Sequence, residues 1–317
     1  MVDAPALSKE EFLMRVFHEI PKEVPAYIAL FLYFAVGAVM LFLTYRTRAW
    51  FMLCVTVTAW FEVIGFAIRL LMIKGPNPTL GQFIGMQAIL IITPVLLPIA
   101  DYIMVGRLMT QGDASKLRIK PHWVARLFTA SDIISLVVQS GGAGLISSDN
   151  PSTQKMGTGV MLVGLALQLG FFSCFTVIAV YVHKSRVFAL RNAEYWRPVF
   201  LCMYLTIALM YVRNIFRVAE FATGYDGYLA SHEVFFYVFD FAVLFVCICV
   251  FCCYHYGFYP VPEYDSDAVH PMRDAPSQSG PVGQVGCCGV IAVKPHEKAG
   301  VCEMSASADV PGAANNV

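Results

Sequence analysis

Long apolar runs, each separated from the next by a few polar or turn-forming residues, make up most of this chain. A helix that crosses the ~30 Å hydrocarbon core of a bilayer needs about 20 mostly apolar residues. The chain contains seven such runs, at about 25–45, 51–73, 83–106, 124–146, 158–182, 198–221 and 234–258. The runs are continuously apolar and do not alternate, which favours helices over a transmembrane barrel. The pattern predicts an all-α integral membrane protein with seven transmembrane helices, the third bent by Pro94 and Pro98.

The composition agrees with this prediction. Apolar residues make up 58% of the 317 residues and charged residues only 14%, against about 45–50% and about 25% in soluble domains. Such a chain is too apolar to be disordered and has too few charges to be a soluble globule. Its 22 basic and 22 acidic residues leave no net basic field, which argues against a nucleic-acid partner.

The basic residues near the ends of the runs predict the orientation in the membrane. About 14 of them follow runs one, three, five and seven, and about 5 lie on the opposite side. The positive-inside rule then places the N-terminus outside and the C-terminus in the cytoplasm. We therefore expect an extracellular segment over 1–23, a transmembrane domain over 24–259 and a disordered cytoplasmic tail over 260–317, whose partners stay unknown.

Polar residues recur at a spacing of seven inside five of the runs. Seven residues span nearly two helical turns, so each pair lies on one helix face. The stripes comprise Glu62 and Arg69 in run two, Gln87 and Asp101 in run three, Asp132 and Gln139 in run four, Arg213, Arg217 and Glu220 in run six, and Glu233, Tyr237 and Asp240 in run seven. Run five contains one further polar residue, Gln168.

These stripes should face the interior of the bundle, because a charge exposed to lipid costs from a few to more than ten kcal/mol, depending on the estimate. Arg217 and Glu220 can pair within one helix, and the acids outnumber the arginines. The stripes either form a polar network that only holds the bundle together or line a path for a substrate or protons. We favour the path. The glycine-rich stretches 141–144 and 157–164 allow close helix approach, or else mark an unwound segment at a cavity.

Several mechanisms are excluded by motifs that the sequence lacks. There is no GxxxxGK[ST] loop, so this chain does not drive transport with ATP through a Walker site. Every lysine lies outside the runs, which excludes a retinal Schiff base. No metal-ligand pattern and no nucleophile–base pair stands out, so we expect neither an enzyme nor a cofactor.

Segments in four of the runs resemble a known family. They are 62–69 (EVIGFAIR), 128–142 (FTASDIISLVVQSGG), 212–220 (VRNIFRVAE) and 237–240 (YVFD). In these segments the chain is similar to the fungal lipid-translocating exporters of the resistance-to-aminocholesterol (RTA-like) type, which include sphingoid long-chain-base exporters. The resemblance implies seven helices, an outside N-terminus, and a location in the plasma membrane or an endomembrane. Asp101 departs from the family pattern.

Our prediction is a translocator of amphipathic lipids such as a sphingoid long-chain base, not driven by ATP and with proton coupling as an open option. The amine of such a cargo would meet Glu62, Asp132, Glu220 or Asp240, while its chain stays in lipid. The arginines would pair with resting carboxylates or receive a phosphate or hydroxyl-rich head group. The alternative is a seven-helix sensor or regulator of lipid asymmetry or stress response.

Overall fold

The structure, a computed structural model, describes residues 9–17, 21–110, 121–146, 148, 150–185, 194–223 and 232–259. All of these residues belong to one compact unit, Met1–Asp265. The predicted cytoplasmic tail, 260–317, lies outside the described residues, as do 1–8 and 111–120.

Seven helices in the described part of the chain are long and apolar enough to cross a membrane, which confirms the predicted number of spans. The regular helices are α2 (Glu23–Thr47), α3 (Leu53–Lys74), α4 (Leu80–Ile92), α5 (Leu97–Met109), α6 (Pro121–Ile146), α7 (Pro151–Lys184), α8 (Arg197–Ala222), α10 (Glu233–Phe235) and α11 (Val243–Cys253). Short 3₁₀ turns η1 (Trp50–Met52) and η5 (Glu194–Trp196) precede α3 and α8, and η7 (Tyr256–Phe258) follows α11.

The fifth span begins at Pro151, earlier than the apolar run at 158–182 suggested. Asn150 caps α7, because its Oδ1 accepts a hydrogen bond from the backbone N–H of Ser152 at 3.0 Å. Pro151 then occupies the first turn, where its missing N–H costs no hydrogen bond. The Asn-Pro pair therefore starts α7 directly after the break that separates it from α6.

Two of the spans depart from regular α-helix along their length. The third consists of α4 and α5, joined by the 3₁₀ segment η2 (Thr93–Leu96), which carries Pro94 and lies where the sequence predicted a bend. The seventh contains the π-helical segment η6 (Phe236–Ala242) between α10 and α11. Such i→i+5 turns are rare and occur often at functional sites. No feature of the sequence pattern predicted it.

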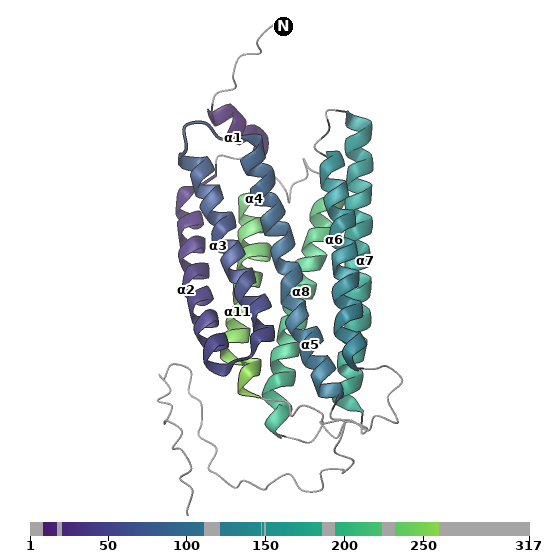
Figure 1. Cartoon of the computed structure of the whole chain (residues 1–317). Coiled ribbons are helices and arrows are strands. Elements are labelled where there is room, and N and C mark those ends of the chain that lie inside the picture. The colour runs from purple at the N-terminus through teal and green to yellow at the C-terminus, as the bar shows by residue number, and fades with distance from the viewer. Residues whose placement is uncertain are drawn as a thin grey trace, which may run out of the picture. The chain divides into compact units, whose positions relative to one another are not determined.

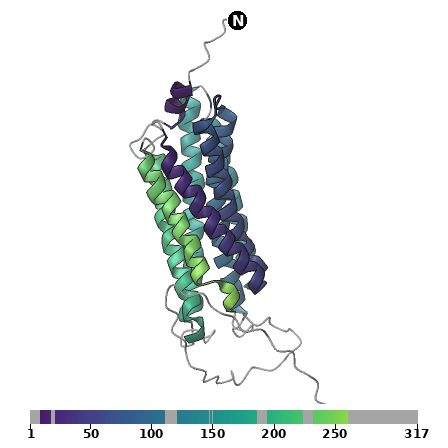
Figure 2. The same ribbon diagram turned by 90° about the vertical axis from the view of Figure 1, so that its left-hand side faces the viewer.

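The spans pack in a closed ring in which each contacts the next. The order of packed neighbours is α2, α3, α4–α5, α6, α7, α8, α11 and back to α2. Figure 1 shows α6 and α7 side by side, opposite α2 and α3, and Figure 2 shows α2 running beside the seventh span. Because α5 also contacts α3, α7 and α8, the broken third span lies toward the middle of the ring.

Glycine brings α6 and α7 into backbone contact, as the sequence predicted. A Cβ on Gly157 would lie 2.8 Å from the carbonyl oxygen of Gly142, and one on Gly142 would lie 2.9 Å from that of Gly157. A Cβ on Gly164 would lie 2.7 Å from Cγ of Gln139. Small residues permit such crossings between membrane helices. Here the α7 glycines are also what brings Gln168 beside Gln139.

The outward faces of the helices are apolar. Large hydrophobic side chains that are more than half exposed occur on six of the seven spans, among them Phe31, Ile134, Val177 and Ile215, and Ile84 of the third span is 47% exposed. Charged side chains of the spans turn the other way, with Glu62, Arg69, Asp132, Arg213 and Asp240 each no more than 5% exposed. An apolar rim around a charged interior is the arrangement expected of a bundle in lipid.

A short helix, α1 (Lys9–Phe17), lies at the end of the bundle where α2 begins and α3 ends. Its Leu13 is buried, and Phe17 meets Phe83 of α4 edge to face, with ring centroids 5.5 Å apart. The predicted N-terminal segment therefore includes a packed helix, which the sequence pattern did not indicate.

Candidate functional site

Two arginines of α8 and one aspartate of η6 form the centre of the buried charge. Arg213 and Arg217 lie one turn apart on α8 and are 5% and 8% exposed. Asp240 lies between their guanidinium groups. Its Oδ1 is 2.7 Å from Nε of Arg213, and its Oδ2 accepts a hydrogen bond from Nη2 of Arg217. Nη1 of Arg217 also donates to Glu220 at 3.0 Å, which confirms the predicted pair within one helix.

Glu62 of α3 joins this arginine cluster from a third helix. Its side chain is buried and lies within electrostatic range of Arg213, Arg217 and Asp240. Three spans therefore contribute charge to one place in the interior. Each ion costs several kcal/mol to desolvate, so breaking one member of such a cluster is expected to destabilise the protein strongly.

A second ion pair joins Arg69 of α3 to Glu233 at the start of the seventh span. Phe17 of α1 lies over the Arg69 guanidinium, 4.7 Å from it, and Tyr237 lies 5.7 Å away. The backbone N–H of Lys22 donates to the other Glu233 oxygen at 3.3 Å. This pair thus ties α3, the seventh span and the N-terminal segment together.

The π-helical segment explains why Glu233 and Asp240 have different partners. A spacing of seven would place both on one face of a regular helix. Because η6 winds more residues into each turn, Asp240 faces Arg213 and Arg217 on α8, whereas Glu233 faces Arg69 on α3. The single stripe predicted for this span is divided between two helices.

Asp101 and Asp132 lie in two separate polar contacts. Asp101 of α5 accepts hydrogen bonds from Thr206 at 2.8 Å and from Tyr256 of η7 at 2.5 Å. Asp132 of α6 accepts one from Tyr102 at 2.9 Å. No arginine, lysine or histidine forms an ion pair with either acid among the described residues. The structure does not bring these two acids to the arginine cluster, where the prediction had placed them.

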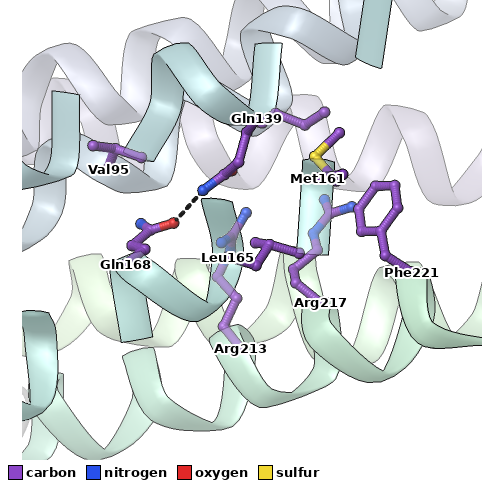
Figure 3. Close-up of a pocket in the computed structure, with 9 residues that line it drawn as sticks. Val95, Gln139, Met161, Leu165, Gln168, Arg213, Arg217 and Phe221 are labelled. Carbon is purple, nitrogen blue, oxygen red and sulfur yellow. Dashed lines mark hydrogen bonds between the residues drawn. The ribbon is translucent and has the colours of Figure 1, made fainter. Parts of the chain in front are cut away.

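A hollow borders the arginine cluster on the side of α6 and α7. Its walls are Ile91, Val95, Gln139, Met161, Leu165, Gln168, Arg213, Arg217 and Phe221. Figure 3 shows the two guanidinium groups extending from α8 toward Gln139 and Met161. The hollow comprises about 320 Å³ of empty space, part of which is open to the surroundings of the protein. The enclosed part has room for little more than one water molecule.

Two glutamines close one wall of the hollow. Gln139 of α6 donates through Nε2 to Oε1 of Gln168 on α7 at 2.9 Å, and both side chains are buried. Gln87 of α4, also predicted as a site residue, is half-buried and makes no side-chain hydrogen bond within the described part of the chain.

The predicted site residues therefore separate into distinct groups. Four of the predicted residues line or border the hollow as one group, namely Gln139, Gln168, Arg213 and Arg217. Sequence reasoning missed the hydroxyl partners Tyr102, Thr206 and Tyr256. An aromatic residue with a polar end inside an apolar run was a usable signal for the two tyrosines. The apolar walls Met161, Leu165 and Phe221 gave no such signal.

Metal binding finds no support among the described residues. No group of three or more His, Cys, Asp or Glu side chains is placed there to hold an ion. The cysteines of the described spans are free thiols.

Comparisons with known proteins identify relatives of the chain. A family model described as RTA1 like protein matches residues 55–261. Protoporphyrin uptake protein 1 of Saccharomyces cerevisiae is 30% identical over 184 residues, 56% of this chain and 60% of that protein. Protein RTA1 of the same yeast is 29% identical over 195 residues, 60% and 61% of the two chains.

A third yeast relative is named sphingoid long-chain base transporter RSB1. It is 26% identical over 249 residues, 66% of this chain and 65% of that protein. The chain thus spans about three-fifths of the length of the first curated relatives it matches. No solved structure matches it.

Proposed function

Because this chain belongs to the RTA1-like family of multi-pass membrane proteins, we propose that it moves amphipathic lipid-like molecules across a membrane. Two relatives are named for carrying sphingoid long-chain bases and for uptake of protoporphyrin. Both of these molecules combine a large apolar body with a polar end. A toxic amphiphile of this kind, such as a sphingoid base, is the cargo class that we propose for export.

One observation supports this function most. Charged side chains of α3, α8 and the seventh span gather beside a hollow whose walls come from four spans. Charges in a membrane interior are expensive and are rarely kept for packing alone. A polar site within an apolar bundle suits a cargo whose head group needs hydrogen bonds while its tail remains in lipid.

The proposed movement requires the hollow to widen. Its enclosed part holds little more than a water molecule, so the structure corresponds to a closed state. The breaks at η2 and η6 adjoin the hollow and the arginine cluster, and interrupted helices are where membrane proteins commonly bend. We propose that these two spans shift, that the N-terminus lies outside as the basic residues indicate, and that the protein acts at the plasma membrane.

A reconstituted system tests the proposal. The purified chain is placed in liposomes that contain a fluorescent sphinganine, and the fraction reachable by an external quencher is followed without ATP. Faster transbilayer movement than in protein-free liposomes is expected. Unchanged movement of both this label and a fluorescent lysophosphatidic acid, with the protein folded and correctly inserted, would refute the translocator.

The second candidate is a sensor or regulator with the same fold. The observation in its favour is that the buried Asp240 of η6 and the partly buried Glu233 of α10 are held in ion pairs, as a two-state switch would require. Saturable binding of the amphiphile without transbilayer movement in the same liposomes would favour this function.

A further inference from the structure

The hollow beside α8 has a specific imbalance of hydrogen-bonding groups. Arg213 has five N–H donors and is 95% buried. Its Nε lies 2.7 Å from Asp240 but is not aligned for a hydrogen bond. Neither Nη group of Arg213 has a hydrogen-bond partner within the described residues. A buried donor without an acceptor costs about 1–3 kcal/mol, more when it is charged.

The glutamines add more donors than acceptors. The amide Nε2 of Gln139 donates to Gln168 Oε1. This leaves the amide N–H groups of Gln168 as further donors and the carbonyl oxygen of Gln139 as an acceptor. Arg217 borders the same space, and its buried Nε also lacks a partner. No aspartate or glutamate is among the residues that line the hollow.

An occupant of the hollow must therefore accept several hydrogen bonds and donate few. An ammonium group donates only, and it would face two guanidinium groups. A hydroxyl accepts, but its own proton would have to reach the Gln139 carbonyl oxygen. A carboxylate or phosphate oxygen accepts only, and guanidinium groups bind such oxyanions more strongly than they bind neutral acceptors.

The local charges determine how an anion is held. Asp240 and Glu220 already pair with the two arginines. Of the four acids expected from the sequence to receive an amine, Glu220 and Asp240 are engaged by these arginines and Asp132 by Tyr102. Glu62 lies within electrostatic range of both arginines, and none of the four acids is among the walls of the hollow. An incoming oxyanion takes the unused N–H groups of Arg213 rather than replacing Asp240.

We propose that this hollow, in the widened state described above, is the binding site for the oxyanion of an amphiphile's head group, a phosphate monoester or a carboxylate, held by the Nη groups of Arg213 and the amide of Gln168. That the oxyanion belongs to the transported molecule rests on the translocation of amphiphiles proposed above. Within that class, the hollow favours a cargo with an acidic head group over the sphingoid base named there. The apolar walls formed by Met161, Leu165 and Phe221 would contact the first carbons of its tail.

Equilibrium binding to the full chain in detergent micelles tests this proposal independently of transport. The probe is tritiated oleoyl lysophosphatidic acid, measured by scintillation proximity. The competitors are monooleoylglycerol, which lacks only the phosphate, sphinganine, which carries an amine, and inorganic phosphate. We expect saturable binding, with both monooleoylglycerol and sphinganine competing at least about tenfold more weakly than the unlabelled probe.

Three variants locate the binding. Arg213→Gln should weaken binding of the probe at least about tenfold. Gln168→Leu should weaken binding of the probe by a smaller factor. Because this variant leaves every ion pair in place, it still tests the proposal if Arg213→Gln protein does not fold. Arg46→Gln makes the same chemical change at an exposed position of α2 and should bind with wild-type affinity.

Each result has a distinct meaning. Wild-type affinity in both hollow variants, equal competition by sphinganine or monooleoylglycerol, or no binding to folded wild-type protein would overturn the proposal. Displacement by inorganic phosphate at the same concentration would support an oxyanion site but show that the tail adds nothing. If the probe binds as expected but no lipid moves in liposomes, only the translocator is contradicted. If Arg213→Gln protein still moves sphinganine and still binds the probe with unchanged affinity, only the oxyanion site is contradicted.

Discussion

Asp240 on the seventh span lies 2.7 Å from Nε of Arg213 on α8, and its other oxygen accepts a hydrogen bond from Arg217. One carboxylate thus forms ion pairs with two guanidinium groups that are four residues apart. The contact joins neighbouring helices at a depth where water is scarce, so both the stability of the bundle and the position of the arginines depend on it.

Asp240→Asn is therefore expected to destabilise the protein strongly. The substitution leaves the two buried guanidinium groups with Glu220 as their ion-pair partner and Glu62 within electrostatic range. Removing one member of a buried pair costs about 3–5 kcal/mol. Thermal unfolding in detergent, followed by the loss of a monodisperse chromatographic peak, measures the change. The matched control is Glu23→Gln, because Glu23 and Lys74 form an exposed pair at 3.7 Å. Equal melting temperatures for the two variants would contradict the assigned role of Asp240.

The Arg69–Glu233 pair should be energetically coupled. In a double-mutant cycle of Arg69→Gln and Glu233→Gln, the double variant should be less destabilised than the sum of the single variants, by about 0.5–3 kcal/mol. The cause is that each single change leaves a charge unpaired beneath Phe17. Additive single changes in melting experiments would show that the ion pair does not hold α3 to the seventh span.

Glycine positions on α7 offer a closely matched comparison. A Cβ on Gly157 would lie 2.7 Å from the backbone nitrogen of Ile146, whereas one on Gly159 would meet nothing within 4 Å. Gly157→Ala should lower the melting temperature by forcing α6 and α7 apart. Gly159→Ala should leave it equal or higher, since alanine favours helix by up to about 1 kcal/mol over glycine. The same response in both variants would argue against the close crossing.

Asp101 should act in stability rather than in transport. It joins α5 to α8 and η7 through the hydroxyls of Thr206 and Tyr256. Asp101→Leu removes both acceptors and should lower the melting temperature, while Asp101→Asn, which keeps one acceptor, should lie between it and wild type. Folded Asp101→Asn protein should still move lipid in liposomes. If Asp101→Asn protein has wild-type stability but no longer moves lipid, Asp101 takes part in transport.

The sequence was sufficient to predict the spans and the residues that carry buried charge. Continuous apolar runs determine helix number because a bilayer has a fixed thickness, and charge in such runs must turn inward. Which charges meet could not be predicted in the same way. The seven-residue spacing of Glu233 and Asp240 assumed a regular helix, and η6 changes which neighbour each residue faces.

The sequence also could not predict which residue on a neighbouring helix each buried aspartate contacts. Asp101 and Asp132 are the same residue type as Asp240, yet each has tyrosine rather than arginine as its partner. Their positions depend on the packing order of the ring, and a hydropathy pattern holds no information on that order. Conversely, the contact of Gln139 with Gln168 follows from the α6–α7 glycines, which the sequence did single out.

The most direct test of the account compares transbilayer movement through two proteins that differ in one arginine. Liposomes with fluorescent lysophosphatidic acid receive equal amounts of folded Arg213→Gln or Arg46→Gln protein, and the rate at which label becomes accessible to an external quencher is recorded. The account predicts a rate equal to wild type for Arg46→Gln and at least about tenfold slower for Arg213→Gln. Equal rates for the two variants would contradict the claim that the cargo passes the arginine cluster.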